Sequence, residues 1–228
     1  MTFRAVLAAL VISVPWVAAQ TPAETILESS SEAVQAVSDA SFLVQGTTVG
    51  PDGGVMQVDL EVLAIRDPLA VSVYVFAPAA LADNILAFDE DTLYDYAFIT
   101  NQLTLSDLDD PDALGGPFGS FEPGTLTQAF DLNEALAAWN GSILEDGMDT
   151  PRGPATRLGF ENPDATADVG RAVVDIVDRD RLPYRLELLT QDGDTFAELR
   201  LVDLQVDTGL TRDDVLAFPP DAQVIDER

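Results

Sequence analysis

The stretch that decides the fold runs from residue 182 to residue 226 and reads "LPYRLELLTQDGDTFAELRLVDLQVDTGLTRDDVLAFPPDAQVID". Within it, apolar and polar residues alternate along 184–190 and 195–206, and "QDGD" joins the two runs. Alternation with a period of two is typical of strands that have one dry face and one wet face. The stretch therefore predicts a pair of strands followed by a tail that ends on Phe218 and two prolines.

The same alternation recurs in other parts of the chain. Residues 41–65, "SFLVQGTTVGPDGGVMQVDLEVLAI", hold two apolar runs around "GPDGG", whose glycines and Pro-Asp pair are typical of a hairpin turn. In the last long strand the outward positions change from even to odd after Arg200, which predicts a β-bulge near Leu201 and Val202. Further strands are predicted at 69–78, 93–99, 103–105 and 171–178.

Two segments, 23–37 and 130–141, show the residue spacing of amphipathic helices. The apolar stripe of the second consists of Leu132, Leu136 and Trp139. These three residues fit two interpretations, ordinary core or a movable lid over a binding site, and the spacing does not separate them. Segments rich in proline, glycine and aspartate at 107–124 and 146–165 predict loops.

These elements predict an α+β fold made of one curved antiparallel sheet. Many consecutive antiparallel strands with one dry face must curl, and one or two helices must cover that face. The polar side of the C-terminal strands is expected to carry Asp175, Arg185, Glu187, Glu198 and Arg200. The dry face is expected to consist of Val58, Leu60, Val62, Val71, Val73, Val75, Val174, Ile176, Leu186, Leu188, Leu199 and Leu201.

The first nineteen residues predict a secretory signal. Arg4 is followed by an apolar run that is short for a membrane span and by small residues at Ala18 and Ala19. We expect cleavage after Ala19, which leaves a single domain over 20–228 in the periplasm or, alternatively, secreted. The chain has no cysteine, so its stability must come from its core and not from disulfides.

The chain is strongly acidic, with 40 acids, 11 arginines and a net charge of −29. Such a charge repels nucleic acid and anionic membrane surfaces, so we expect no nucleic-acid partner. A partner steered by electrostatics would be basic; the alternative is that the charge only keeps an exported protein soluble. An apolar fraction of 47% argues against intrinsic disorder.

The residue inventory offers little for catalysis. The absence of histidine, cysteine and lysine excludes a histidine-based dyad or triad, a cysteine nucleophile and a Schiff base. Carboxylate pairs are so numerous that they carry no signal for a glycosidase. The acids in "SDLDDPDALGG" at 106–116 depart from a calcium-binding loop and fit a solvated loop better. We therefore expect a non-enzymatic protein with no metal and no cofactor.

The C-terminal stretch resembles the outer-membrane lipoprotein carrier (LolA) family and its relatives. The resemblance lies in the strand that begins "LPYRLEL", a Gly-Leu segment, and a phenylalanine followed by two prolines, here Pro183, Leu186, Gly209, Leu210, Phe218, Pro219 and Pro220. It extends to "FDEDTLYDYAFITNQLTL" and to "SDASFLVQGTT", and so touches about half of the chain beyond the signal.

The resemblance implies an unclosed, strongly curved antiparallel β-barrel, a half-barrel, with helices over a concave apolar face that holds acyl chains. It implies a monomeric periplasmic carrier of lipoprotein or lipid acyl chains, with membrane-bound donor and acceptor partners. In the family an arginine on an early strand latches the lid, but "LAVSVYVFAPAALADN" has none, and the nearest, Arg66, lies in a turn. The alternative is an envelope-stress sensor of the RseB type on the same fold, and a hydrolase ranks third.

Overall fold

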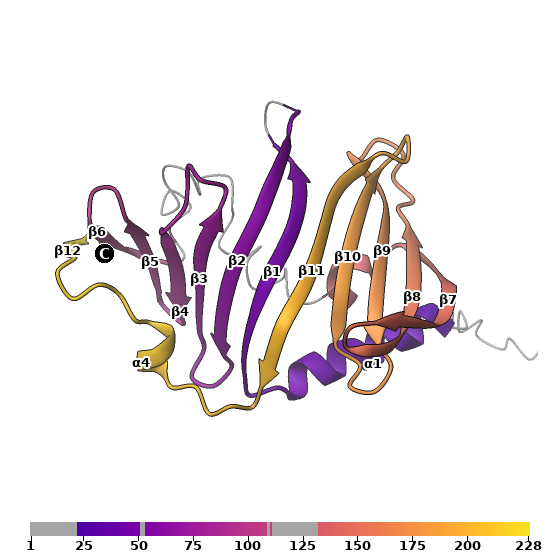
Figure 1. The fold of residues 1–228 in the computed structure, drawn as a ribbon, viewed down its shortest axis with the longest axis horizontal. Coiled ribbons are helices and arrows are strands. Elements are labelled where there is room, and N and C mark those ends of the chain that lie inside the picture. Colours follow the sequence, from indigo (N-terminus) through magenta and orange to yellow (C-terminus); the bar gives the residue numbers. More distant parts are fainter. Residues whose placement is uncertain (1–21, 51–52, 109, 111–131) are drawn as a thin grey trace, which may run out of the picture.

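The computed structural model of the protein describes residues 22–50, 53–108, 110 and 132–228. The predicted signal and most of the predicted loop at 107–124 lie outside these residues. The described chain forms one twelve-stranded sheet in the spatial order β12-β6-β5-β4-β3-β2-β1-β11-β10-β9-β8-β7 (Figure 1). Because the end strands β12 and β7 do not pair, the sheet is unclosed, and the predicted α+β half-barrel is confirmed in this coarse form.

The sheet consists of two meanders of consecutive antiparallel strands. The first contains β1 (Asp39–Val49), β2 (Val55–Ile65), β3 (Ala70–Ala77), β4 (Ile85–Asp89), β5 (Thr92–Ala97) and β6 (Gln102–Asp107). The second contains β7 (Asn140–Thr150), β8 (Gly153–Glu161), β9 (Val169–Val177), β10 (Pro183–Thr190) and β11 (Thr195–Val206). The short β12 (Gln223–Asp226) lies parallel to β6, which it covers at the edge of the sheet.

The two meanders join where β1 pairs with β11, from Ala40 opposite Val206 to Thr48 opposite Ala197. The register shifts where Leu43 faces Val202 but Ser41 faces Gln205, so β11 has one extra residue there. The bulge predicted from the alternation is therefore present, slightly beyond its predicted position.

Several sequence predictions need correction. The segment 146–165, predicted as a loop, instead contains the end of β7 and all of β8. Of the helix predicted at 130–141, the described residues form only the short α3 (Leu132–Leu136), since the chain enters β7 at Asn140, which pairs with Glu161. Strand β4 was not predicted, because all five of its residues are buried and show no alternation.

Two core clusters lie on the same face of the sheet. One consists of Phe42, Val62, Val71, Val75, Leu86, Phe88 and Leu93, on β1 to β5. The other joins Ala23 and Leu27 of α1 (Pro22–Ala36) and Leu136 of α3 to Leu158, Phe160, Ala172, Val174 and Ile176 of β8 and β9. We call this face the helix-side face. Among the described residues, helices pack on it only at the β7–β10 end, so the predicted helical cover is not confirmed for the rest.

Helix α1 ends at a junction fixed by an arginine. Nε of Arg66, in the turn after β2, donates to the carbonyl oxygen of Val37 over 3.1 Å, and its Nη2 donates to that of Val34 over 2.9 Å. A cation at a helix C-terminus satisfies free carbonyls and complements the helix dipole. The short α4 (Arg212–Val215) lies elsewhere, with Val215 packed on Ile65 and Ala70.

Candidate binding face

The structure places all twelve residues of the predicted dry face on the helix-side face. Side chains of directly paired residues in a sheet point to the same side, so the register can be followed from strand to strand. Val73 pairs with Val62, and Val62 with Phe42. Across the join between the meanders, Leu201 pairs with Val44. The series continues from Leu199 to Leu186 and from Leu186 to Val174.

The burial of these residues varies along the face. Val62, Val71, Val75, Val174 and Ile176 are buried in the two core clusters. The remaining residues on β2, β10 and β11 are half-buried: Val58, Leu60, Leu186, Leu188, Leu199 and Leu201. We call these six residues the central strip. Two of them, Val58 and Leu199, belong to neither core cluster. The central strip is thus an aliphatic surface between two packed ends.

The predicted lid residues contact the cluster at the β7–β10 end. Leu136 is buried, while Leu132 and Trp139 are half-buried and pack against the cluster. The backbone N–H of Trp139 donates to the carbonyl oxygen of Leu136 over 2.9 Å, which closes the turn between α3 and β7. In this conformation the three side chains act as core, and a lid movement stays a prediction.

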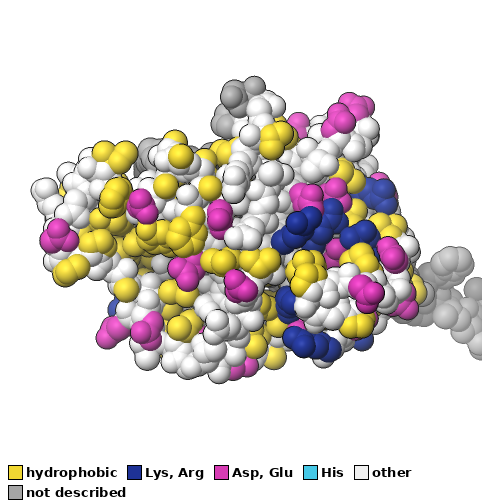
Figure 2. Space-filling view, in the orientation of Figure 1, with side chains coloured by type: hydrophobic (Ala, Val, Ile, Leu, Met, Phe, Trp, Pro, Cys, Tyr) yellow, Lys and Arg dark blue, Asp and Glu magenta, His cyan; other side chains and the backbone are white. Residues whose placement is uncertain are grey.

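The opposite face carries a network of ion pairs over β8 to β11, as the alternation predicted. Nε and Nη2 of Arg157 donate to the two oxygens of Asp175 over 2.7 and 2.9 Å, and this bond raises the pKa of Arg157. Arg185 pairs with Glu187 over 2.8 Å and with Glu198 over 3.0 Å. The hydrogen bond from Arg185 lowers the pKa of Glu198. Figure 2 shows the arginines gathered there.

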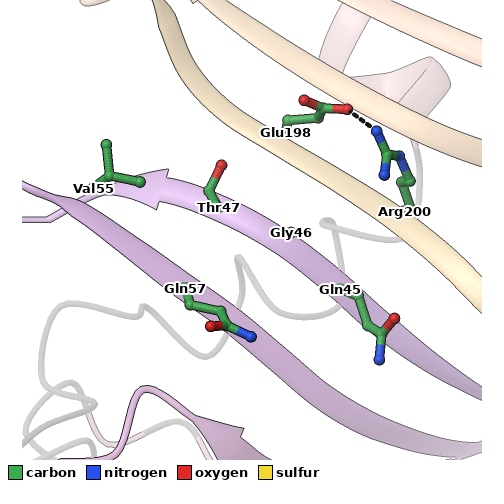
Figure 3. Close-up of a pocket in the computed structure, with 7 residues that line it drawn as sticks. All are labelled: Gln45, Gly46, Thr47, Val55, Gln57, Glu198 and Arg200. Atoms are coloured by element: carbon green, nitrogen blue, oxygen red, sulfur yellow. Dashed lines mark hydrogen bonds and ion pairs between the residues drawn. The ribbon is translucent and has the colours of Figure 1, made fainter.

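Next to this network lies an open hollow of about 540 Å³ on β1, β2 and β11. Figure 3 shows the side chains of Gln45, Gln57, Glu198 and Arg200 around it, with Arg200 bonded to Glu198 over 2.6 Å. The hollow is lined mainly by polar groups and lies on the face opposite the central strip. The alternation pattern does not predict this hollow, since the outward positions of a sheet give no sign of one.

The described residues include no group of three or more acids placed to hold a metal ion. Of the acidic loop at 106–116, residue 109 and residues 111–116 lie outside them. Among the helices that the structure describes, none combines the length and apolar composition needed to cross a membrane.

Comparisons with known proteins define the fold. No protein-family model matches the sequence, and no curated protein matches it. Many solved structures are similar, including the following three. An uncharacterized conserved protein from Thermus thermophilus has a TM-score of 0.61 at 19% identity, covering 90% of this chain and 99% of that one. Lipoprotein LppX from Mycobacterium tuberculosis has a TM-score of 0.53 at 16% identity, covering 85% and 100%.

The third similar structure is a chain of the Pseudomonas aeruginosa MucA/MucB complex. Its TM-score is 0.55 at 13% identity, and the match covers 87% of this chain and 62% of that one. Likenesses at these identities show a shared fold and nothing more. Together they show that this protein has the fold of these structures, and they support the predicted resemblance at the level of the fold.

Proposed function

We propose that this protein is an exported, non-enzymatic carrier that binds the acyl chains of lipoproteins or lipids and moves them between membranes. The observation that supports this proposal is the central strip, where six aliphatic side chains lie in register and half-buried on one face of an unclosed sheet. The envelope location and the donor and acceptor membranes are part of the proposal.

The energetics of hydrocarbon explain why such a surface is sufficient for binding. Each methylene buried from water contributes about 0.8 kcal/mol, so a sixteen-carbon chain gains on the order of 10 kcal/mol. That gain requires apolar contact and no reactive group. Val58, Leu60, Leu199 and their neighbours on the strip offer such contact across β2, β11 and β10.

The test compares two substitutions on β11. Leu199→Asp places a carboxylate on the central strip, and Val202→Asp is the matched control because Val202 is also half-buried but lies on the opposite face. We expect the unaltered protein to co-purify with acyl-containing lipid in native mass spectrometry. Leu199→Asp should reduce bound lipid at least about tenfold, because an ionised carboxylate in an apolar contact costs several kcal/mol. The proposal is refuted if the unaltered protein carries no lipid. It is also refuted if both variants fold and lose the same amount of bound lipid.

A second candidate function is a sensor that binds a partner protein, and the MucA/MucB likeness favours it. That structure is a complex of two proteins, and the chain that matches has this fold. A sensor of this kind would be recovered bound to a second protein chain when purified gently from its native cells. A mass that equals the protein plus lipid supports the carrier, and a mass that equals two chains supports the sensor.

A further inference from the structure

The ends of three successive hairpins in the first meander form an apolar edge. Strands β1, β3 and β5 end at Val49, Ala77 and Ala97. Alternate strands of an antiparallel meander end at the same edge of the sheet, so the turns after them lie on one side. Four large side chains are exposed there: Val55 by 80%, Phe76 by 46%, Phe98 by 53% and Ile99 by 89%. We call these four residues the apolar rim.

Contacts between the turns tie the apolar rim together. The first two turns flank an open hollow of about 790 Å³, lined by Val55 and Met56 on one side and by Phe76 and Pro78 on the other. The third turn is fixed to the second, because the backbone N–H of Phe98 donates to Oδ1 of Asn84 over 2.9 Å. The exposed side chains therefore belong to one connected edge.

This edge is depleted in charge. The segments 45–58, 70–88 and 96–106 contain two acids and no arginine, in a chain with 40 acids. One of the two, Asp83, accepts a hydrogen bond from the Tyr74 hydroxyl over 2.6 Å, and Asp52 lies outside the described residues. One acid of the C-terminal segment lies beside the third turn, since the backbone carbonyl oxygen of Asp221 accepts a hydrogen bond from Nδ2 of Asn101 over 3.0 Å.

The corresponding turns of the second meander differ. The turns at 161–169 and 190–195 carry three and two acids. Figure 2 shows acidic side chains at the upper ends of β9 and β10, and hydrophobic ones at the upper ends of β3 and β5 and beside the β1–β2 hairpin. The scarcity of charged residues at this edge, together with its exposed aromatic and aliphatic side chains, indicates a surface for an apolar partner.

We propose that the apolar rim docks the protein on the surface of an electrically neutral lipid bilayer. The four side chains stand at the ends of three hairpins, beside an open hollow and not in a closed groove, an arrangement that fits a partner without a fixed shape better than a single peptide. Aromatic and branched aliphatic side chains are favoured at the boundary between lipid head groups and acyl chains. The net charge of −29 disfavours anionic bilayers, so the lipid is zwitterionic. This inference goes beyond acyl-chain binding and stands on different residues.

The experiment is flotation of the purified full chain with phosphatidylcholine vesicles. The test variant combines Phe98→Ser with Ile99→Ser. The control combines Ile143→Ser with Leu144→Ser, which removes two other exposed apolar side chains, exposed by 42% and 43%, from β7. We expect the unaltered protein and the control to float, and the rim variant to partition about tenfold less.

Vesicles with about one third phosphatidylglycerol should bind less of the unaltered protein, because the acidic chain is repelled. Added salt should reverse that loss by screening. The proposal is overturned if the unaltered protein stays in solution with phosphatidylcholine, or if the rim and β7 variants lose binding equally. Native mass spectrometry of the rim variant separates this result from the carrier function, since its bound lipid should be unchanged.

Discussion

Asp175 and Arg157 form a two-point ion pair in which the carboxylate is only 1% exposed and both of its oxygens are bound. Asp175→Ala should lower the free energy of unfolding by about 3 kcal/mol, because it leaves a partly buried guanidinium without its counter-charge. The matched control is Glu161→Ala, which breaks the exposed pair with Arg171 and should cost less than about 1 kcal/mol. Urea unfolding measures both losses of free energy. If Asp175→Ala costs no more than Glu161→Ala, the buried pair on β8 and β9 contributes no more than an exposed one.

The hydroxyl of Tyr74 should lose its proton at a higher pH than that of an ordinary tyrosine. Its hydroxyl donates to Oδ1 of Asp83 over 2.6 Å, and this bond raises the pKa of Tyr74 to about 12. Because the folded pKa lies above the usual value of 10.0, the stabilisation is present below pH 10 and is lost as the pH rises towards 12. The absorbance of tyrosinate should show a late component that disappears in Tyr74→Phe. An unchanged titration curve in the variant would contradict the assignment.

Asp39 should contribute to stability only when it is ionised. Its carboxylate accepts bonds from the N–H and hydroxyl of Thr208 and from the N–H of Gly209, over 2.8 to 3.0 Å. Burial opposes ionisation, but these bonds outweigh it and lower the pKa of Asp39 below 3.8. The stabilisation is therefore present above about pH 4 and is lost as the pH falls through the lowered pKa.

Asp39→Asn tests this expectation by thermal unfolding as a function of pH. The variant should melt below the unaltered protein at pH 7, and the gap should close as the pH falls below 4. Asp192→Asn, in the exposed turn between β10 and β11, serves as the control and should leave the melting temperature unchanged. A gap of constant size at all pH values would mean that the Asp39 charge is not responsible.

Gly46 is required for the join between the two meanders. A Cβ at this position would lie 1.8 Å from the carbonyl oxygen of Glu198, on the backbone of the paired strand. Gly46→Ala should therefore cost about 3 kcal/mol or more, because neither strand can move without breaking the pairing. Thr47→Ala, one residue further along β1, is the control. A folded Gly46→Ala protein of normal stability would show that the strands separate easily.

The segment 132–145 should respond to a bound acyl chain if α3 is a lid. Leu132 and Trp139 are only half-buried, and α3 is a helix of only five residues. Hydrogen exchange of these amides should change when a lipid is added, while the buried strand β9 should not respond. Unchanged exchange at 132–145 in the lipid-bound protein would leave α3 as ordinary core.

The sequence predicted the elements that have one wet face and missed those that do not. Strands β2, β10 and β11 alternate clearly, so the bounds of β10 and β11 and even the bulge could be predicted. Strand β7 was missed because it is an exposed edge strand with little burial to impose a pattern. Its partner β8 contains Gly159, where a side chain would collide with Leu144 of β7, and the glycine had indicated a loop.

The candidate site was predictable only in part. Which aliphatic residues share a face follows from alternation, and the register agrees with that assignment. Their different burial does not follow, because Val174 and Leu186 have similar surroundings in the sequence but differ in what packs above them. The apolar rim and the hollow beside Arg200 were not predicted, since exposure at a turn depends on the tertiary arrangement.

The pairing of residue 40 with residue 206 has a consequence for how the protein reaches its native state. Contacts between such distant positions form slowly, so we expect a newly made chain to pass through two separate half-sheets in which β1, paired with β2, and β11, paired with β10, are open edge strands. Each free strand could accept a strand from another copy. The charge of −29 opposes this exchange, because like-charged molecules repel one another.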